Sequence, residues 1–236
     1  MKSTGIVFLF QFMILLCFGQ EVPGYQGKRF SANYDGFIFP ALFHPTGEFY
    51  ETSSLAFNKR HSLGIDYVIS RSSSMGMDLQ TFKTGFSFKN YGNTRGSIAA
   101  KNIGIYFKNF HKNDIAPLGL YSKYELLFLS YNVSYSAERV FKNLHESEQY
   151  PSYTNLGPYT ALMFAYSIGK QAVYFDRLIL NGSFQSAFSP KMFGKFFAQG
   201  IGDNPSEKKY IEQITQSRLF GAYFINFNLG IGYLIF

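Results

Sequence analysis

The chain has 236 residues with 46% hydrophobic and 19% aromatic content, and its formal net charge is +7. Its mean hydropathy is close to zero, and its single cysteine, Cys17, excludes a disulfide framework and a cysteine metal cluster. Beyond the N-terminus no apolar run approaches the length of a membrane helix. A membrane protein of this sequence would therefore have to be a closed β-barrel.

The N-terminus has the parts of a secretory signal peptide. Lys2 supplies the positive charge, an apolar run follows, and Cys17 and Gly19 place small residues at the −3 and −1 positions. We therefore predict a signal peptide over residues 1–19 and a periplasmic lead over residues 20–28. A lipoprotein anchored at Cys17 is the alternative, which the bulky residue before the cysteine disfavours.

After the lead, apolar and polar residues alternate with the period of two that is typical of a β-strand. The first two predicted strands cover residues 29–39 and 61–71, and a long loop separates them. In the second strand the alternation is regular, with Leu63, Ile65 and Tyr67 on one face and Ser62, Gly64 and Asp66 on the other.

The third and fourth strands are predicted over residues 79–91 and 97–110, after a turn at residues 72–78. In the third strand the pattern predicts an outer, lipid-facing side with Phe82, Phe86 and Phe88. In the fourth strand the predicted outer residues are Ile103, Ile105 and Phe107.

The fifth predicted strand, residues 120–135, changes phase along its length, which we interpret as a β-bulge near Phe128. A polar loop with a short helix follows. The sixth and seventh strands are predicted over residues 159–167 and 172–188, joined by a turn at residues 168–171.

The last segment, Leu219 to Phe236, has the clearest strand pattern. Its apolar face includes Tyr223, Ile225, Phe227, Leu229, Ile231 and Tyr233, whereas the opposite face is small and polar without a charge. An apolar face toward lipid and a small polar face toward a lumen are typical of an outer-membrane barrel strand. At a tilt of roughly 40°, the two tyrosines are spaced by about 25 Å of bilayer, which matches the two aromatic girdles.

The sequence thus predicts an all-β protein in which residues 29–236 form a transmembrane antiparallel up-and-down β-barrel of eight strands. Short helices are predicted in the extracellular loops. With both termini in the periplasm, the three longest connections lie on the outer side, as is usual for such barrels. Ten strands are the alternative, because the loop after the first strand is long enough for another hairpin.

Four segments carry a family resemblance. They are GYQGKRF (residues 24–30), IAPLGLY (115–121), FDRLIL (175–180) and NLGIGYLIF (228–236). In this order, the chain resembles the small outer-membrane β-barrels of Bacteroidetes-type bacteria over essentially its whole mature length. The resemblance implies the fold and the outer-membrane location, and it implies no catalytic residues.

Eight charged residues are candidates for the inner side of the barrel, whose interior is just wide enough for side chains. Because buried charges must pair, we expect a salt-bridged network that fills the lumen. A narrow conduit for ions or small solutes is the alternative. The eight residues are Asp35, Asp66, Lys83, Lys89, Lys108, Lys123, Glu125 and Arg177.

The sequence contains little that predicts catalysis. His61 and Ser62 are adjacent, so their side chains point to opposite faces of a strand and cannot form the His–Ser pair of a lipid-modifying barrel enzyme. No metal-ligand spacing and no phosphate-binding loop occurs, and the dispersed basic residues argue against nucleic-acid binding. We predict no catalytic residue, cofactor or metal, and keep a lipid-modifying enzyme as the third hypothesis.

The connection between the last two predicted strands is the remaining functional candidate. We expect it to be ordered, with a helix over residues 206–216, and to cover the barrel mouth or contact a partner through Phe193, Phe196, Phe197 and Tyr210. Expected partners are outer-membrane lipid, lipopolysaccharide and other envelope proteins. The favoured function is a non-enzymatic structural or accessory barrel, which includes a role as a subunit of a larger envelope complex.

Overall fold

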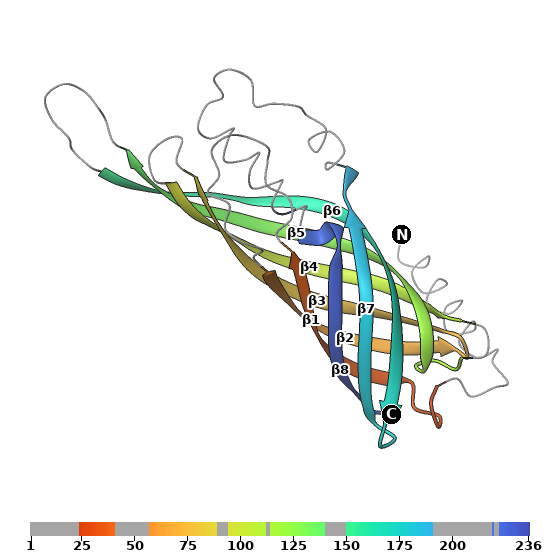
Figure 1. The fold of residues 1–236 in the computed structure, drawn as a ribbon. Helices are drawn as coiled ribbons and strands as arrows, with labels where there is room; N and C mark the ends of the chain where they lie inside the picture. Colours follow the sequence, from red (N-terminus) through yellow and green to blue (C-terminus); the bar gives the residue numbers. More distant parts are fainter. Residues whose placement is uncertain are drawn as a thin grey trace, which may run out of the picture.

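The computed structural model describes residues 24–40, 57–88, 94–111, 114–139, 150–190, 219 and 222–236, which form a closed antiparallel β-barrel (Figure 1). Each strand pairs with its neighbours in chain order, and β1 pairs with β8, so the prediction of an eight-stranded up-and-down barrel is confirmed. Because β1 also pairs directly with β2, the ring contains no further hairpin and the ten-strand alternative is wrong. The strands are β1 (Phe30–Pro40), β2 (Phe57–Ser70), β3 (Ser73–Phe88), β4 (Thr94–Phe110), β5 (Gly119–Arg139), β6 (Tyr150–Tyr174), β7 (Leu178–Phe188) and β8 (Asn226–Leu234).

The two ends of the barrel differ in their connections. At one end, here called the terminal end, β1 begins and β8 ends, and the backbone amides of Arg29 and Phe30 both donate to the carbonyl of Phe236. The connections β2–β3, β4–β5 and β6–β7 also lie there. The other four connections lie at the opposite end, here called the loop end, and this is the distribution that the loop lengths predict.

The prediction for the third strand was wrong in its start and in its phase. β3 begins at Ser73, within the predicted turn, because the serine, glycine and aspartate residues there supply the small, polar inner face of a barrel strand. Phe82 is buried inside the barrel and Lys83 is exposed on the outer wall, the reverse of the predicted orientation. At this level of the barrel the lumen is apolar and the outer wall is polar.

The predicted bulge in the fifth strand is also wrong. β5 keeps one phase, and its odd-numbered residues are buried from Tyr121 to Tyr135. The apolar residues shift from even to odd positions along β5 because the lumen itself changes from charged to apolar, while the alternation stays the same. The irregularity lies in β6, where Gly157 and Pro158 stand opposite the single residue Asn132.

β6 is longer than predicted, and its turn to β7 lies at residues 175–177 instead of 168–171. Ile168 is exposed and Gln171 is buried, so the alternation of the strand continues through the predicted turn. Gly169 and Gln171 indicated a turn there, but in a filled barrel they belong to the inner face. β7 consequently begins at Leu178.

The closing strand is shorter than predicted. β8 begins at Asn226, and residues 222–224 form a helical turn before it (dark blue in Figure 1). Tyr223 is fully buried inside the barrel, so its predicted place on the lipid-facing wall was wrong. The other predicted outer residues are exposed on the outer wall: Ile225, Phe227, Leu229, Ile231 and Tyr233.

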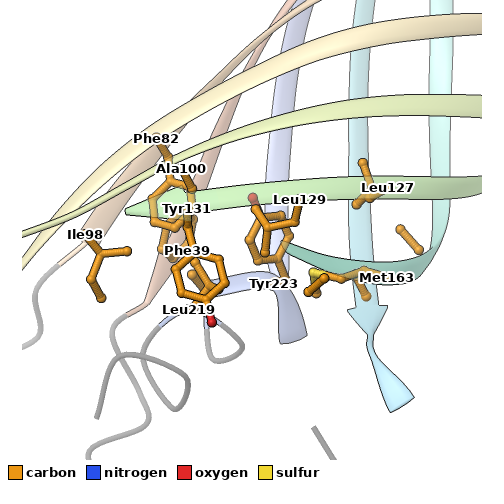
Figure 2. Packing of buried hydrophobic residues seen from close by; sticks show 14 of the residues in the cluster. Phe39, Phe82, Ile98, Ala100, Leu127, Leu129, Tyr131, Met163, Leu219 and Tyr223 are labelled. Atoms are coloured by element: carbon orange, nitrogen blue, oxygen red, sulfur yellow. The ribbon is translucent and has the colours of Figure 1, made fainter. Parts of the chain in front are cut away.

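Apolar side chains fill the lumen at the loop end (Figure 2). Leu219 and Tyr223, which precede β8, pack there against side chains of β1, β3, β4, β5 and β6. The ring of Phe82 meets those of Phe39 and Tyr223 edge to face, with centroid distances of 6.1 and 5.8 Å. We call this cluster the loop-end plug. It fixes the segment before β8 inside the barrel.

The outer wall has the opposite character, because most of its apolar side chains are exposed. On β2 to β5 they form three rows in register, which we call the apolar belt. Exposed apolar surface of this extent needs an apolar environment. The rows are Leu63, Leu79, Ile103 and Phe128; Ile65, Met77, Ile105 and Leu126; and Tyr67, Met75, Phe107 and Tyr124.

Candidate functional site

A polar network fills the middle of the lumen, and all eight strands contribute to it because alternate residues of every strand point inward. Its members lie between the loop-end plug and a second apolar cluster at the terminal end. The members are Asp35, Arg60, Asp66, Asp78, Gln80, Asn102, Lys108, Lys123, Glu125, Gln171, Asn181, Ser183, Gln185 and Asn228. The second cluster contains Val68, Phe110, Ala116 and Tyr121.

Lys123 of β5 is at the centre of the network. Its Nζ lies 3.3 Å from Asp78 Oδ2 and 3.1 Å from Glu125 Oε2. Gln80 Nε2 donates to the same two carboxylates, at 3.1 Å to Asp78 Oδ1 and 3.2 Å to Glu125 Oε1. All four side chains are buried, so the ammonium and amide groups replace the water that would otherwise solvate the carboxylates.

Arg60 of β2 connects this cluster with the loop-end plug. Its guanidinium donates to Gln185 Oε1, and Gln185 Nε2 donates to Glu125 Oε2 at 2.8 Å. The guanidinium carbon also lies 4.0 Å from the ring centroid of Phe37 and 4.4 Å from that of Tyr223. The cation of this fully buried arginine is therefore held by aromatic faces as well as by an amide.

A second ion pair lies nearer the terminal end. Lys108 Nζ is 2.6 Å from Asp66 Oδ2 and 3.4 Å from Gln171 Oε1. The same ammonium group lies 5.3 Å from the ring centroids of both Tyr106 and Tyr121. Two aromatic rings thus complete the surroundings of a buried lysine whose carboxylate partner comes from a different strand.

Asp35 of β1 joins the network at the seam where the barrel closes. Its Oδ1 accepts hydrogen bonds from Asn181 Nδ2 and Asn228 Nδ2, both at 3.2 Å. Gly230 of β8 faces the carboxylate, and a Cβ at this position would collide with Asp35 Oδ1. A glycine is needed here because the side chain of Asp35 occupies the space in front of β8.

The structure brings together most of the predicted lumen charges. Asp66, Lys108, Lys123 and Glu125 are buried in the network, and Asp35 lies at its edge, half-buried. These residues come from four strands and meet only in the closed barrel.

Two of the predicted lumen charges lie elsewhere. Lys83 is on the outer wall, because the alternation of β3 has the opposite phase from the one predicted. Arg177 is exposed in the β6–β7 turn, where its guanidinium donates to Tyr233 Oη at 2.9 Å, a hydrogen bond that raises the pKa of Arg177. Lys89 lies outside the described residues.

Sequence reasoning missed four members of the network that are buried and polar: Arg60, Asp78, Gln80 and Gln171. Asp78 was assigned to a turn and Arg60 to a loop. Continuing the alternation of the second predicted strand by one residue toward the N-terminus would have placed Arg60 on the inner face, which is the signal that was available. For Asp78, the predicted phase of the third strand would also have had to be reversed.

The N-terminal lead is attached to the β6–β7 turn. Tyr25 Oη and Gln26 Nε2 donate to Asp176 Oδ1 at 3.2 and 3.1 Å, and Lys28 Nζ donates to the backbone carbonyl of Asp176 at 2.9 Å. Desolvation and the hydrogen bond to this carboxylate raise the pKa of Tyr25. The lead and the turn therefore form one contact at the terminal end.

Some predicted features fall outside the described residues. They are the signal peptide, the loop helix at residues 206–216, and the loop residues Phe193, Phe196, Phe197 and Tyr210. In the part of the chain that the structure describes, no three His, Cys, Asp or Glu side chains gather in a metal-binding arrangement. That part also contains no helix that is long and apolar enough to span a membrane.

No known protein family and no curated protein sequence matches the chain. Among solved structures, it is similar to Ail, the attachment invasion locus protein of Yersinia pestis, with 10% identity and a TM-score of 0.44 over 87% of this chain and 98% of that one. Neisserial surface protein A gives 7% identity and a TM-score of 0.40, over 87% and 97% of the two chains. The N-terminal β-barrel domain of Pseudomonas aeruginosa OprF gives 8% and 0.39, also over 87% and 97%. These similarities are too low to transfer any property, so the conclusions below depend on the residues of this chain.

Proposed function

We propose that the protein is an integral outer-membrane β-barrel with a filled lumen, and that its role is structural or accessory, as a rigid base for its loop-end segments. One observation carries the proposal: the strands bury a charged network inside and expose an apolar belt outside. A soluble barrel would have the reverse arrangement, with its apolar residues inside. In lipid, by contrast, acyl chains contact the apolar belt, and neighbouring strands of the closed ring satisfy each other's backbone hydrogen bonds where they pair.

The height of the belt supports this location. On β8 and the residue that follows it, the exposed apolar residues extend from Phe227 to Ile235. At the rise and tilt of barrel strands, nine residues cover about 20–25 Å, close to the apolar band of an outer-membrane barrel. Tyr233 and Tyr124 supply exposed aromatic rings near the terminal end of the belt.

Membrane fractionation tests the location. We expect the full chain, expressed with its N-terminus intact, in the outer-membrane fraction, resistant to alkaline carbonate and with faster gel migration before heating than after it. Recovery in the aqueous fraction after cell lysis would overturn the proposal. The resemblance to Bacteroidetes-type barrels supports the choice of such a host for this experiment.

We further propose that export uses the segment of residues 1–19, with cleavage after Gly19. The charged start, the apolar run and the small residues before the cut support it. Mass spectrometry of the purified protein should give a chain that begins at Gln20. A mature chain that still contains Lys2, or one with a lipid on Cys17, would contradict this proposal.

A closed lumen is favoured over a transport conduit. Lys123, Tyr106 and Arg60 lie across the middle of the barrel with their partners, and the loop-end plug follows them along the axis. We expect no resolved unit conductance for the purified protein in planar bilayers. Tyr106→Ala combined with Tyr121→Ala, checked for folding by gel migration, is the control with an opened lumen. Steady channels from the unaltered protein would instead support the conduit.

A non-enzymatic role is supported by the surroundings of the two described histidines. His61 is exposed on the outer wall and shares a hydrogen bond of 2.6 Å with Tyr34, while Ser62 is buried on the opposite face. Within the described residues, neither His61 nor His111 has an imidazole hydrogen bond to a serine or threonine hydroxyl. Lipid A from a strain that lacks the gene should have unchanged mass, and a changed acyl pattern would revive the enzyme hypothesis.

A further inference from the structure

A basic groove lies on the outer wall at the loop-end side of the apolar belt. Its volume is about 710 Å³, and it spans four adjacent strands, β2 to β5. The outward-facing residues that line it are Lys59, His61, Thr81, Lys83, Ala99, Lys101, Ser130 and Asn132.

The groove begins where the belt ends. On β2, β3 and β4, the outward residues that follow Leu63, Leu79 and Ile103 by one step of alternation are polar or basic, and they pair in one row: His61 with Thr81, Thr81 with Lys101, and Lys101 with Ser130. The change from apolar to polar surface therefore occurs within two residues on each strand. In a membrane, this boundary lies at the level of the lipid headgroups.

Among the side chains that the structure describes, no acidic group forms an ion pair with the three lysines of the groove. Lys59, Lys83 and Lys101 are exposed, and no acidic residue lines the groove. The acidic side chains that the structure describes lie in the lumen or at the terminal end: Asp35, Asp66, Asp78, Glu125, Asp114 and Asp176. Three lysine cations on one face, with no acidic partner among the described side chains, fit an anionic ligand that carries more than one charge.

A second groove, which is apolar, adjoins the first. Its volume is about 690 Å³, and it is lined by residues of β7, β8, β1, β2 and β3. Leu63 and Leu79 line it, and each lies one outward position from a residue of the basic groove. Tyr34 lines the apolar groove and is hydrogen-bonded to His61 of the basic groove, so the two surfaces are continuous.

We propose that the two grooves together bind one phosphorylated lipid of the outer leaflet. Its phosphate groups contact the three lysines, and one acyl chain lies in the apolar groove. This inference rests on the proposed membrane location, which puts the loop end at the outer leaflet. Anionic headgroups are attracted by each lysine near the surface, and the apolar groove adds contact area for a chain.

Native mass spectrometry of the full chain released from detergent micelles tests the inference, with diphosphoryl lipid A as the probe and phosphatidylethanolamine as the zwitterionic reference, which has no net charge. We expect the unaltered protein to retain one lipid A molecule and to bind it much more tightly than phosphatidylethanolamine. The triple variant Lys59→Gln, Lys83→Gln, Lys101→Gln should lose about a hundredfold in affinity. Lys170→Gln, an exposed lysine on the outer wall of β6, is the matched control and should bind as before.

Three results would overturn the inference: equal retention of the two lipids, equal binding by the triple variant, or tighter binding of phosphatidylglycerol, which would indicate general charge attraction. Gel migration before heating verifies that each variant is folded, and Lys101→Gln alone replaces the triple variant if that one is not. Carbonate resistance of the unaltered protein is measured separately. Membrane integration without lipid preference would therefore refute only this inference, whereas loss of integration would refute the proposed function.

Discussion

On β5, Lys123 and Glu125 are buried in the lumen, while Tyr124 and Phe128, which alternate with them, are exposed on the outer wall. The inner and outer walls are formed by alternate residues of the same strands, yet in the middle of the barrel each wall has the chemistry that the other would have in a soluble protein. Toward the loop end the relation reverses again, with Phe82 inside and Lys83 outside. Whether a residue faces the lumen or the outside can therefore be predicted from its polarity only when its position along the barrel axis is known.

The inner wall should be most sensitive to the loss of a central charge. Lys123→Met removes the cation that Asp78 and Glu125 share, and we expect the free energy of unfolding to fall by about 3–5 kcal/mol, as for other broken buried ion pairs. Urea unfolding in phospholipid vesicles, followed by far-ultraviolet circular dichroism, measures the change. Lys170→Met, on the exposed wall, should leave it unaltered. Equal stability of both variants would show that the lumen does not depend on its ion pairs.

The outer wall should be sensitive to charge only within the belt. Ile105→Lys puts an ammonium group into the middle apolar row, and we expect a loss of about 2–4 kcal/mol in the free energy of unfolding in vesicles. Ser134→Lys, exposed nearer the loop end of β5, is the control and should have little effect. If both substitutions cost the same, the belt is not the part of the wall that contacts lipid.

The close packing of the inner wall can be tested with a single methyl group. At Gly76 of β3 a Cβ would collide with the carbonyl oxygen of Ile65 and with the ring of Tyr106, so Gly76→Ala should cost about 1–3 kcal/mol through overpacking. At Gly182 of β7 the nearest atom to a Cβ would be 3.9 Å away, and Gly182→Ala should be tolerated. Thermal unfolding in detergent compares the two, and a tolerated alanine at Gly76 would mean that the lumen has free space.

The smallest effect is expected where the polar network meets the loop-end plug. Tyr223→Phe keeps the ring that packs on Phe82 and Arg60 but removes the hydroxyl that accepts from Asn102. We expect a loss of about 0.5–1.5 kcal/mol, the net value of one hydrogen bond. A double-mutant cycle with Asn102→Ala isolates the pair. Strictly additive effects would show that this contact does not couple the helical turn to the barrel.

Fold class and most strands could be predicted from the sequence because alternation is a local property. The period of two in Leu63, Ile65 and Tyr67 requires only that one face of the strand be apolar, and the outer residues of β4 and β8 follow in the same way. The number of alternating segments gave the number of strands, and the lengths of the connections agreed with it and gave the end at which the long connections lie. Four of the buried charges were found on this basis: Asp66, Lys108, Lys123 and Glu125.

Alternation does not say which face is the inside, and this was decided by the tertiary structure. Phe82 and Tyr223 are buried because the chain before β8 folds into the loop end, and the resulting plug makes that part of the lumen apolar. The hydrogen-bond and ion-pair partners within the network could not be predicted from the sequence either. Asp78 meets Lys123 only when β3, β4 and β5 lie side by side with their register fixed. Composition and period determined that the chain forms a barrel. Closure of the ring, whose interior is charged in the middle and apolar at the loop end, determined which charges meet and which lysines lie on the outer wall. These contacts join residues that are distant in sequence, so alternation within one strand could not predict them.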